Sequence, residues 1–446
     1  MFDRLRSYLP GVSWPIIAAM LALMVISVLA VRIAEAADPS LRGCTARQIA
    51  YVAVAIVAFA AAAVVPYQRI GRGAYVWFAL NLGLLVLVLF LPPIRHSHRW
   101  INLRLFQVQP SELAKLTYIV ALAWYLRYRE NYRRIVGLLP PFLLTLVPAG
   151  LILIEPDLGT ALLLFPTLLF MLFMAGAKLR HLLAVVAVAA GVVLMPVPED
   201  VTGKGSPAVA GRKALAYWRG TVGGREYILA AATLRAMEPH QLSRIEGWLR
   251  QSDPAVAMTK GFQLQQSIII LGSGGLRGQG VLRERNLHFR MLPDDHTDFI
   301  YAVVGGQWGF LGCAGLMIVY AAIFICAVEI ASMTDDPFAR LLVVGVMALL
   351  GSQIFINVGM TMGLMPITGM TLPLVSFGGS SMVVNAAALG LLVNVGIRRP
   401  ILLGRKPFEF GRGKADEDGL YDTPLGDLEG QRRRRWLRGG SGRADK

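Results

Sequence analysis

A cluster of acidic residues marks the start of a long apolar stretch in this sequence. The segment 293–299 reads Pro-Asp-Asp-His-Thr-Asp-Phe, and the apolar run begins at its last residue. A charge at a membrane boundary is costly to maintain, so its presence there indicates chemistry. Carboxylates can serve enzymes as proton acceptors, so these acidic residues, Asp298 among them, are candidates for chemistry at the water-facing edge of the membrane. His296 and Thr297 are candidate substrate-binding residues beside Asp298, although Asp298 could instead cap the helix that follows.

A second group of candidate residues flanks a predicted helix start. Pro110 just before helical periodicity is typical of a first turn, and Glu112 suits the positive end of the helix dipole. Glu112 and Lys115 are three residues apart on one helical face, so an ion pair could bring both charges into the membrane. This pair could bind a substrate, or it could fix the rotation of the helix by packing. Arg99 and Trp100 precede it and are also candidate binding residues.

Two further stretches each allow a structural interpretation beside a functional one. Asp157 lies in a predicted turn between two apolar runs and could bind substrate or cap the next helix through its free amides. Gln266 and Ser267 lead into the glycine-rich segment 272–280, whose backbone could approach a ligand closely. Glycines also permit tight helix packing, and the spacing fits neither a Walker loop nor a dinucleotide fingerprint.

Proline and glycine interrupt the last two apolar runs at Pro366, Gly369 and Pro373. Broken backbone at membrane depth is tolerated only where it is buried in protein or lines a cavity. We therefore expect a polar cavity between these runs, although a hinge turn packed by small residues would also explain the prolines. The candidate binding residues in this stretch are Ser376, Gly378, Gly379, Ser380 and Ser381.

The composition predicts an all-α polytopic membrane protein. Of the 446 residues, 55% are hydrophobic and only 16% are charged. A helix needs ~20 mostly apolar residues to cross a membrane, because backbone polar groups must be satisfied within it. We expect about ten such helices in a membrane domain at 1–403, with a large extracytoplasmic loop at about 199–297 between helices seven and eight. The runs are approximately 14–31, 49–66, 75–92, 113–126, 135–154, 158–177, 182–198, 299–328, 341–365 and 371–397.

Basic residues predict the orientation of these helices. They gather in alternate short loops, which places both termini in the cytoplasm and all the polar stretches above on the opposite side. Much of the net charge of +16 therefore reflects the preference of basic residues for cytoplasmic loops. We expect these residues to contact anionic membrane lipids and not nucleic acid.

The cysteines and the C-terminal segment add little to the functional interpretation. Of the three cysteines, Cys44 lies in a predicted outer loop, and Cys313 and Cys326 lie in one apolar run, so we expect no disulfide and no metal cluster. Residues 404–446 are rich in glycine and charge and lack apolar periodicity, which predicts a disordered cytoplasmic tail.

Taken together, the polar stretches resemble the family of shape, elongation, division and sporulation (SEDS) proteins, to which RodA and FtsW belong. The resemblance implies a peptidoglycan glycosyltransferase that polymerises lipid II, the undecaprenyl-pyrophosphate-linked disaccharide peptide. It would act at the outer face of the cytoplasmic membrane in elongation or division, with a class B penicillin-binding protein transpeptidase as partner, and Asp298 would be the catalytic residue. The stretches that support it are 109–115, 156–160, 266–280, 296–299 and 366–381.

The implied reaction assigns roles to the candidate residues. The attacking sugar hydroxyl is a poor nucleophile, so Asp298 would accept its proton as the new bond forms. Trp100 could stack on a sugar or anchor the chain at the interface. A divalent cation, Mg²⁺ or Mn²⁺, could bridge Asp298 and the pyrophosphate, although no ligand spacing requires one. The cations that could stabilise the leaving pyrophosphate are Arg99, Lys115, Arg244 and, as a weaker candidate, Arg277.

The sequence also departs from the family pattern. Glu155 stands where a glutamine is usual before Pro-Asp-Leu-Gly-Thr, Asp294 and Asp295 replace the common Glu-Ala, and Gly306 and Gln307 replace an acidic pair. The first two changes add acid near the predicted site.

Two other functions are compatible with the same stretches. Broken helices around a polar cavity are typical of transporters, so a lipid II flippase is one alternative. A non-enzymatic scaffold of the division or elongation machinery is the other. The gathering of polar residues on one side favours the enzyme.

Overall fold

The structure is a computed structural model, in which the chain divides into two compact units, 1–399 and 400–446. The described residues all lie in the first unit, so the predicted tail at 404–446 lies outside them, as do Asp294 and Asp295. The described residues are 11–38, 41–92, 99–102, 107–128, 134–193, 197–198, 219–222, 225–228, 239–251, 253–259, 261–280 and 296–398.

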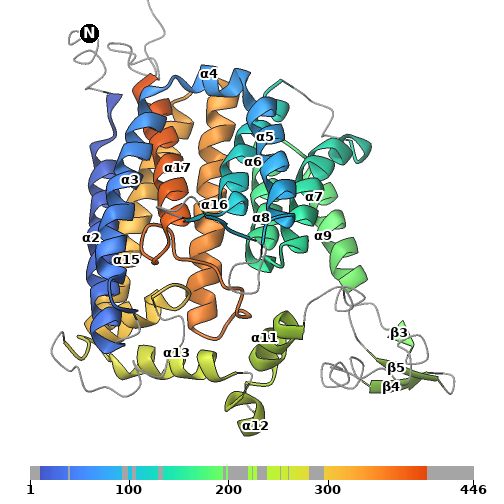
Figure 1. The fold of residues 1–446 in the computed structure, drawn as a ribbon. Helices are drawn as coiled ribbons and strands as arrows, with labels where there is room; N and C mark the ends of the chain where they lie inside the picture. Colours follow the sequence, from blue (N-terminus) through green and yellow to red (C-terminus); the bar gives the residue numbers. More distant parts are fainter. Residues whose placement is uncertain are drawn as a thin grey trace, which may run out of the picture. The chain divides into compact units, whose positions relative to one another are not determined.

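The first unit is a bundle of helices, and each of the ten predicted apolar runs overlaps one of them (Figure 1). The predominantly helical membrane fold is thus confirmed. These helices are α2 (Trp14–Ala37), α3 (Cys44–Val64), α5 (Ala74–Leu89), α6 (Pro110–Leu126), α7 (Leu139–Ile154), α8 (Leu158–Ala175), α9 (Leu179–Val193), α15 (Ile300–Ser332), α16 (Pro337–Thr361) and α17 (Gly379–Arg398).

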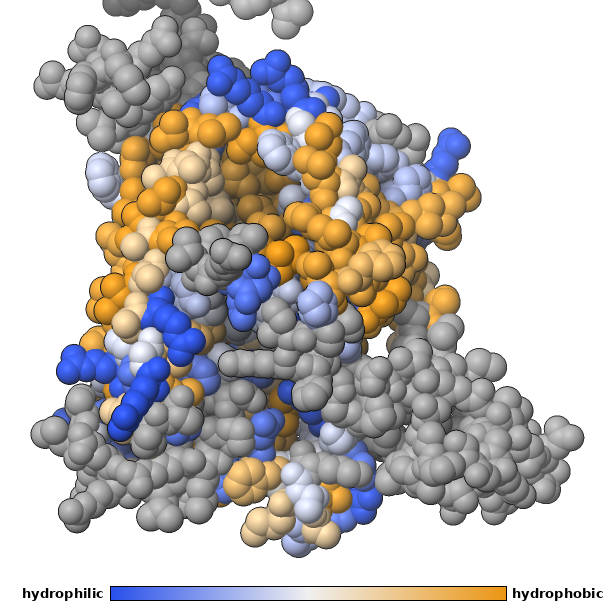
Figure 2. Space-filling view, viewed as in Figure 1, coloured by the Kyte–Doolittle hydropathy of each residue, from blue (hydrophilic) through white to orange (hydrophobic). Residues whose placement is uncertain are grey.

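Seven helical segments among the described residues are long and apolar enough to cross a membrane. The helices α5 and α9 are apolar but shorter, and α6 has 17 residues, including two charged ones. Ten crossings therefore remain a prediction. Figure 2 shows hydrophobic surface across the face of the bundle in view, with hydrophilic atoms at the end formed by α4 (Tyr67–Arg72). This distribution is that of an integral membrane protein.

The ninth predicted run ends earlier, and the tenth begins later, than the sequence predicted. The helix α16 ends at Thr361, and α17 begins only at Gly379 instead of near residue 371. Proline cannot donate a backbone hydrogen bond, which prevents a continuous helix here. Gly363 and Gly369 have φ of +78° and +74°, which L-residues rarely adopt. The predicted interruption is confirmed, and it is longer than the sequence indicated.

Close backbone packing explains the glycine-rich segment near residue 274. A Cβ atom on Gly274 or Gly278 would collide with the backbone of α15, and Phe310 N donates to Gly275 O at 2.8 Å. The helix α15 is kinked at Gly309 beside this segment. The packing alternative is therefore what the structure shows, and Arg277 lies in this segment rather than near the predicted catalytic residue.

The described parts of the predicted large loop contain secondary structure. A three-stranded antiparallel sheet has the order β3-β5-β4, and α13 packs against α15 and α16. The hairpin of β1 (Ile101–Asn102) and β2 (Gln107–Val108) precedes α6. The elements of the loop are β3 (Val197–Pro198), β4 (Arg219–Val222), β5 (Arg225–Ile228), α11 (Pro239–Leu249), α12 (Pro254–Ala257) and α13 (Phe262–Ser273). A 3-10 turn, η4 (Val136–Leu138), leads into α7.

Candidate functional site

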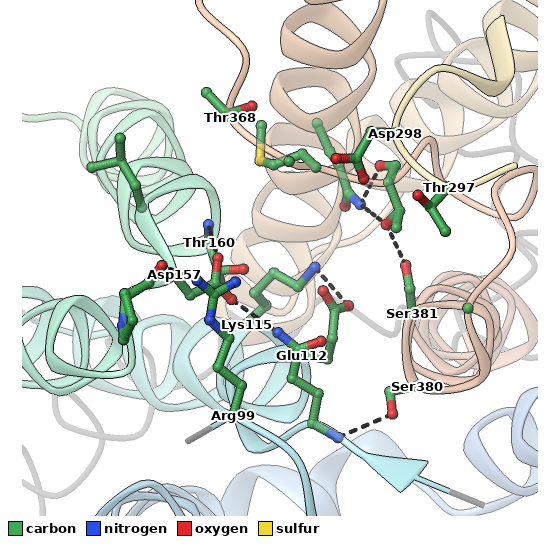
Figure 3. A pocket seen from close by; sticks show the side chains of 18 of the residues that line it. Arg99, Glu112, Lys115, Asp157, Thr160, Thr297, Asp298, Thr368, Ser380 and Ser381 are labelled. Carbon is green, nitrogen blue, oxygen red and sulfur yellow. Dashed lines mark hydrogen bonds and ion pairs between the residues drawn. The ribbon is translucent and has the colours of Figure 1, made fainter. Parts of the chain in front are cut away.

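A cavity of about 290 Å³ gathers most of the predicted site residues (Figure 3). It lies where α6, α8, α15 and α17 begin, between these helices and the irregular segment 367–371. Helix N-termini carry unpaired amides and a partial positive charge, so four of them together favour an anion. Eleven of the sixteen predicted residues line the cavity: Arg99, Trp100, Glu112, Lys115, Asp157, Arg244, Thr297, Asp298, Gly378, Ser380 and Ser381.

The ion pair predicted on α6 is present in the cavity wall. Lys115 Nζ lies 2.7 Å from Glu112 Oε2, and the two side chains are only 2% and 9% exposed. The helix α6 packs against α5, α7, α8, α16 and α17, which explains this burial. Glu112 supplies the opposite charge that offsets the cost of burying the Lys115 ammonium. In Figure 3 the pair lies between Asp157 on one side and Ser381 on the other.

Asp157 caps α8, which confirms one of the two roles that the sequence suggested for it. Its Oδ1 accepts a hydrogen bond from Thr160 N at 3.2 Å. Its Oδ2 accepts two more, from Gln109 Nε2 at 2.9 Å and from Ser111 Oγ at 3.0 Å. One carboxylate therefore ties the start of α6 to the start of α8 while still facing the cavity.

Arg99 is held by the turn between α7 and α8. Its Nε donates to Glu155 O at 2.7 Å, and its Nη2 donates to Pro156 O. Carbonyls at the C-terminal end of a helix lack partners within it, so they are natural acceptors for a guanidinium. The carboxyl group of Glu155 itself is fully buried. Burial, followed by the nearby charge of Asp157, raises the pKa of Glu155 to about 8, and Arg99 partly opposes the shift.

The backbone around Asp298 is fixed by two neighbouring segments. Asn357 Nδ2 on α16 donates to Asp298 O at 2.9 Å, and Phe377 N donates to His296 O at 2.8 Å. Ser376 Oγ donates to Thr297 O at 2.5 Å. The N-cap position of α15 is Phe299, so Asp298 lies one residue before the cap.

Arg244 and Asp298 meet at one glycine. A Cβ atom built on Gly369 would lie 3.0 Å from Arg244 Nη1 and 3.5 Å from Asp298 Oδ2. These residues come from α11, from the turn before α15 and from the irregular segment after α16. A candidate proton acceptor and a candidate anion ligand are thus adjacent in the same cavity.

The start of α17 is joined to the hairpin before α6. Ser380 Oγ donates to Gln107 O at 2.9 Å and accepts from Gln109 N at 3.0 Å. Ser381 Oγ lies 2.7 Å from Thr371 Oγ1. Both serines therefore form part of the cavity frame.

Five predicted binding residues lie outside the cavity lining, where they support it: Gln266, Ser267, His296, Ser376 and Gly379. Ser267 Oγ donates to Thr361 O at 3.0 Å, which joins α13 to α16. The ring of His296 lies 5.3 Å from that of Phe377. A Cβ on Gly379 would lie 2.9 Å from the ring of Tyr51, so this position requires close approach.

Sequence reasoning missed Gln353, which lines the cavity from α16. Its Nε2 donates to Thr371 O at 2.8 Å. An amide in an apolar membrane helix could have indicated it, because such residues are rarely placed there without a role. Gln109, Thr160, Thr368 and Phe377 also line the cavity and belong to the stretches that carry the family resemblance.

Known proteins match this chain over most of its length. A family model described as "Cell cycle protein", for FtsW, RodA and SpoVE, matches residues 9–199 and 209–399. The peptidoglycan glycosyltransferase RodA of Treponema pallidum (strain Nichols) is 33% identical over 391 residues, covering 79% of this chain and 89% of that protein. Stage V sporulation protein E of Bacillus subtilis (strain 168) is 29% identical, covering 78% and 86%.

Solved structures show the same fold. A chain from a study of structural coordination of polymerization and crosslinking by a peptidoglycan synthase complex superposes with a TM-score of 0.67 and 27% identity. The match covers 87% of this chain and 99% of the other. The crystal structure of the rod shape determining protein RodA of Thermus thermophilus gives a TM-score of 0.58 and 26% identity, covering 87% and 98%.

Proposed function

We propose that this chain, which belongs to the family of FtsW, RodA and SpoVE, is a peptidoglycan glycosyltransferase that polymerises lipid II. The observation that carries the proposal is the cavity in which Asp298 and three cations converge at the starts of four helices. A glycosyl transfer from a lipid diphosphate needs both a proton acceptor and an anion site.

The residues divide the chemistry between them. The hydroxyl of one sugar attacks the anomeric carbon of another, and its proton passes to Asp298 as the new glycosidic bond forms. The bond from that carbon to the diphosphate breaks, and the lipid diphosphate leaves with the electron pair. Arg99, Lys115, Arg244 and the helix N-termini offset the charge that builds on the diphosphate.

Any divalent cation that the reaction uses would arrive with the diphosphate. Among the described residues, no three His, Cys, Asp or Glu side chains come together as a metal site. Mg²⁺ commonly takes one or two carboxylates together with phosphate oxygens and waters, and Asp298, which lines the cavity, could supply one of these carboxylates. Activity after chelation and after return of Mg²⁺ or Mn²⁺ tests this.

The decisive experiment compares two aspartate variants on purified lipid II. Asp298→Asn should remain folded and membrane-inserted but lose polymerisation by roughly 10²–10⁴-fold, because it cannot accept the proton. Asp253→Asn is the matched control, since Asp253 lies outside the cavity and caps α12. It should polymerise like the wild type. Polymer at the wild-type rate from Asp298→Asn would reject the assignment of the base.

A flippase is the second candidate, favoured by the broken segment between α16 and α17. Reconstituted protein supplied with lipid II on one side, then assayed separately for polymer and for translocation, distinguishes the two functions. Translocation without polymer would support the flippase.

We further propose that a class B penicillin-binding protein is the partner, in elongation or division, in the cytoplasmic membrane. The similar chain from a peptidoglycan synthase complex supports the partner. A Cβ on Gly11 would lie 3.0 Å from Ile397 O, so these two residues lie at the same end of the bundle. This supports both termini being on one side of the membrane, which the basic loops predict to be the cytoplasmic side. Co-purification with the transpeptidase tests the partner. Labelling of cysteines introduced near each terminus, from each side of the membrane, tests the orientation.

A further inference from the structure

Glu155 has a buried carboxyl group that the reaction scheme above does not use. The residue is 0% exposed, and neither Oε1 nor Oε2 has a hydrogen-bond partner among the described residues. A buried carboxylate without a partner is strongly disfavoured relative to the neutral acid. The pKa of about 8, raised first by burial, agrees with a proton held on this group at neutral pH.

The position of Glu155 connects it to the anion site. Its own carbonyl accepts from Arg99 Nε, and the next carbonyl, of Pro156, accepts from Arg99 Nη2. Among the described residues, the charged groups that act on its carboxyl are Asp157, at the start of α8, and Arg99. The charged residues of α6 that line the cavity are Glu112 and Lys115, which form an ion pair with each other. The ionisation of Glu155 would therefore be felt mainly by Arg99 and Asp157.

We propose that Glu155 is a positioning residue that works in its protonated form, leaving the charge of Arg99 available to the substrate diphosphate and withdrawing it on ionisation. The identity of the anion rests on the proposed function. A neutral Glu155 adds no charge beside the guanidinium. An ionised Glu155 would compete with the diphosphate for Arg99 and would repel the diphosphate directly.

This arrangement makes the anion affinity of this chain sensitive to pH in a way that a glutamine would not. Below the pKa of Glu155 the site keeps its full positive charge. Above it, one added negative charge that acts on Arg99 should weaken diphosphate binding by roughly fivefold, the limit set by full screening in water. The family resemblance places glutamine at this position, so Glu155→Gln keeps the shape and removes only the titration.

The test measures binding of undecaprenyl diphosphate to the full-length protein in nanodiscs from about pH 6 to about pH 9. This probe carries the anion but no sugar, so binding is read without polymerisation. Wild type should lose affinity roughly fivefold relative to Glu155→Gln across that range, and the two should agree at the acidic end. Arg99→Gln should bind weakly at every pH, and Glu155→Asp, which keeps a carboxyl, should keep a pH dependence.

A second readout reports the proton directly. Infrared difference spectra of wild type against Glu155→Gln should contain the carbonyl stretch of a protonated carboxylic acid at neutral pH, which disappears in alkali. Parallel loss of affinity in wild type and Glu155→Gln, or the absence of that band at neutral pH, would overturn the inference. If the difference in binding appears but wild type makes no polymer from lipid II, the glycosyltransferase proposal fails and the role of Glu155 stands.

Discussion

Replacing Lys115 with methionine should both destabilise the protein and abolish polymerisation. Methionine approximates the volume of lysine but leaves Glu112 without its cation in a wall where both side chains are almost fully buried. Removing one partner of a buried ion pair costs about 3–5 kcal/mol in the free energy of unfolding. Such a loss is large compared with the typical total stability of about 5–15 kcal/mol.

The double variant Glu112→Gln/Lys115→Met separates the two roles of the pair. Neutralising both residues removes the unpaired charge, so most of the lost stability should return. If Lys115 also binds the diphosphate, the double variant will be stable but will polymerise poorly, with a raised KM for lipid II. If the pair only fixes the rotation of α6, polymerisation will return together with stability.

The chain supplies a control with matched geometry. Arg250 and Asp253 form an ion pair with the same spacing and the same 2.7 Å separation, but their side chains are 45% and 35% exposed. Asp253→Asn breaks this exposed pair and should change the free energy of unfolding by less than about 1 kcal/mol. Arg250 itself is kept, because it also pairs with the buried Glu246. Thermal unfolding in nanodiscs and lipid II titrations provide both measurements. Equal stability of Lys115→Met and wild type would refute the argument from burial, and wild-type polymerisation by the double variant would refute the anion role.

Three further changes test other parts of the site. Gly369→Ala should lower polymer yield and cost about 1–3 kcal/mol in thermal unfolding, because φ is +74° and the new Cβ would crowd Arg244 and Asp298; the helical Gly83→Ala meets open space and is its control. Gln353→Leu should cost about 1 kcal/mol in thermal unfolding and reduce polymerisation, because it removes the hydrogen bond to Thr371 O; wild-type stability and polymer yield would show that this bond is dispensable. Glu155→Gln should gain stability over wild type as the pH rises from 4.5 to about 8, because over that window native Glu155 retains a proton that the unfolded chain releases. A difference in melting temperature between Glu155→Gln and wild type that stays constant over this pH range would contradict this.

Local features of the site could be predicted because their signals lie within a few residues. The start of α6 followed from Pro110 and from the polar residues after it, and the pairing of Glu112 with Lys115 followed from helical spacing alone. The cap on α8 followed from an acidic residue before an apolar run. The same logic located the helices, since apolar length is a property of the chain rather than of its packing.

Contacts between distant segments could not be predicted in this way. The approach of Arg244 to Gly369 joins α11 to a segment more than a hundred residues later, and nothing near either residue specifies it. The late start of α17 was missed because the stretch before it is apolar enough to read as helix. An amide in an apolar helix was a signal for Gln353, but the backbone carbonyl to which it donates cannot be identified from the sequence.

The irregular segment between α16 and α17 explains why polar residues occur in an apolar helix. A backbone without helical hydrogen bonds must find partners elsewhere in the protein at membrane depth. Two amides of α16 provide them, since Gln353 Nε2 donates to the carbonyl of residue 371 and Asn357 Nδ2 donates to Met370 O. Asn357 Nδ2 also donates to Asp298 O, so the group that stabilises the broken backbone positions the candidate base. A substitution such as Asn357→Leu should therefore lower stability and polymerisation together.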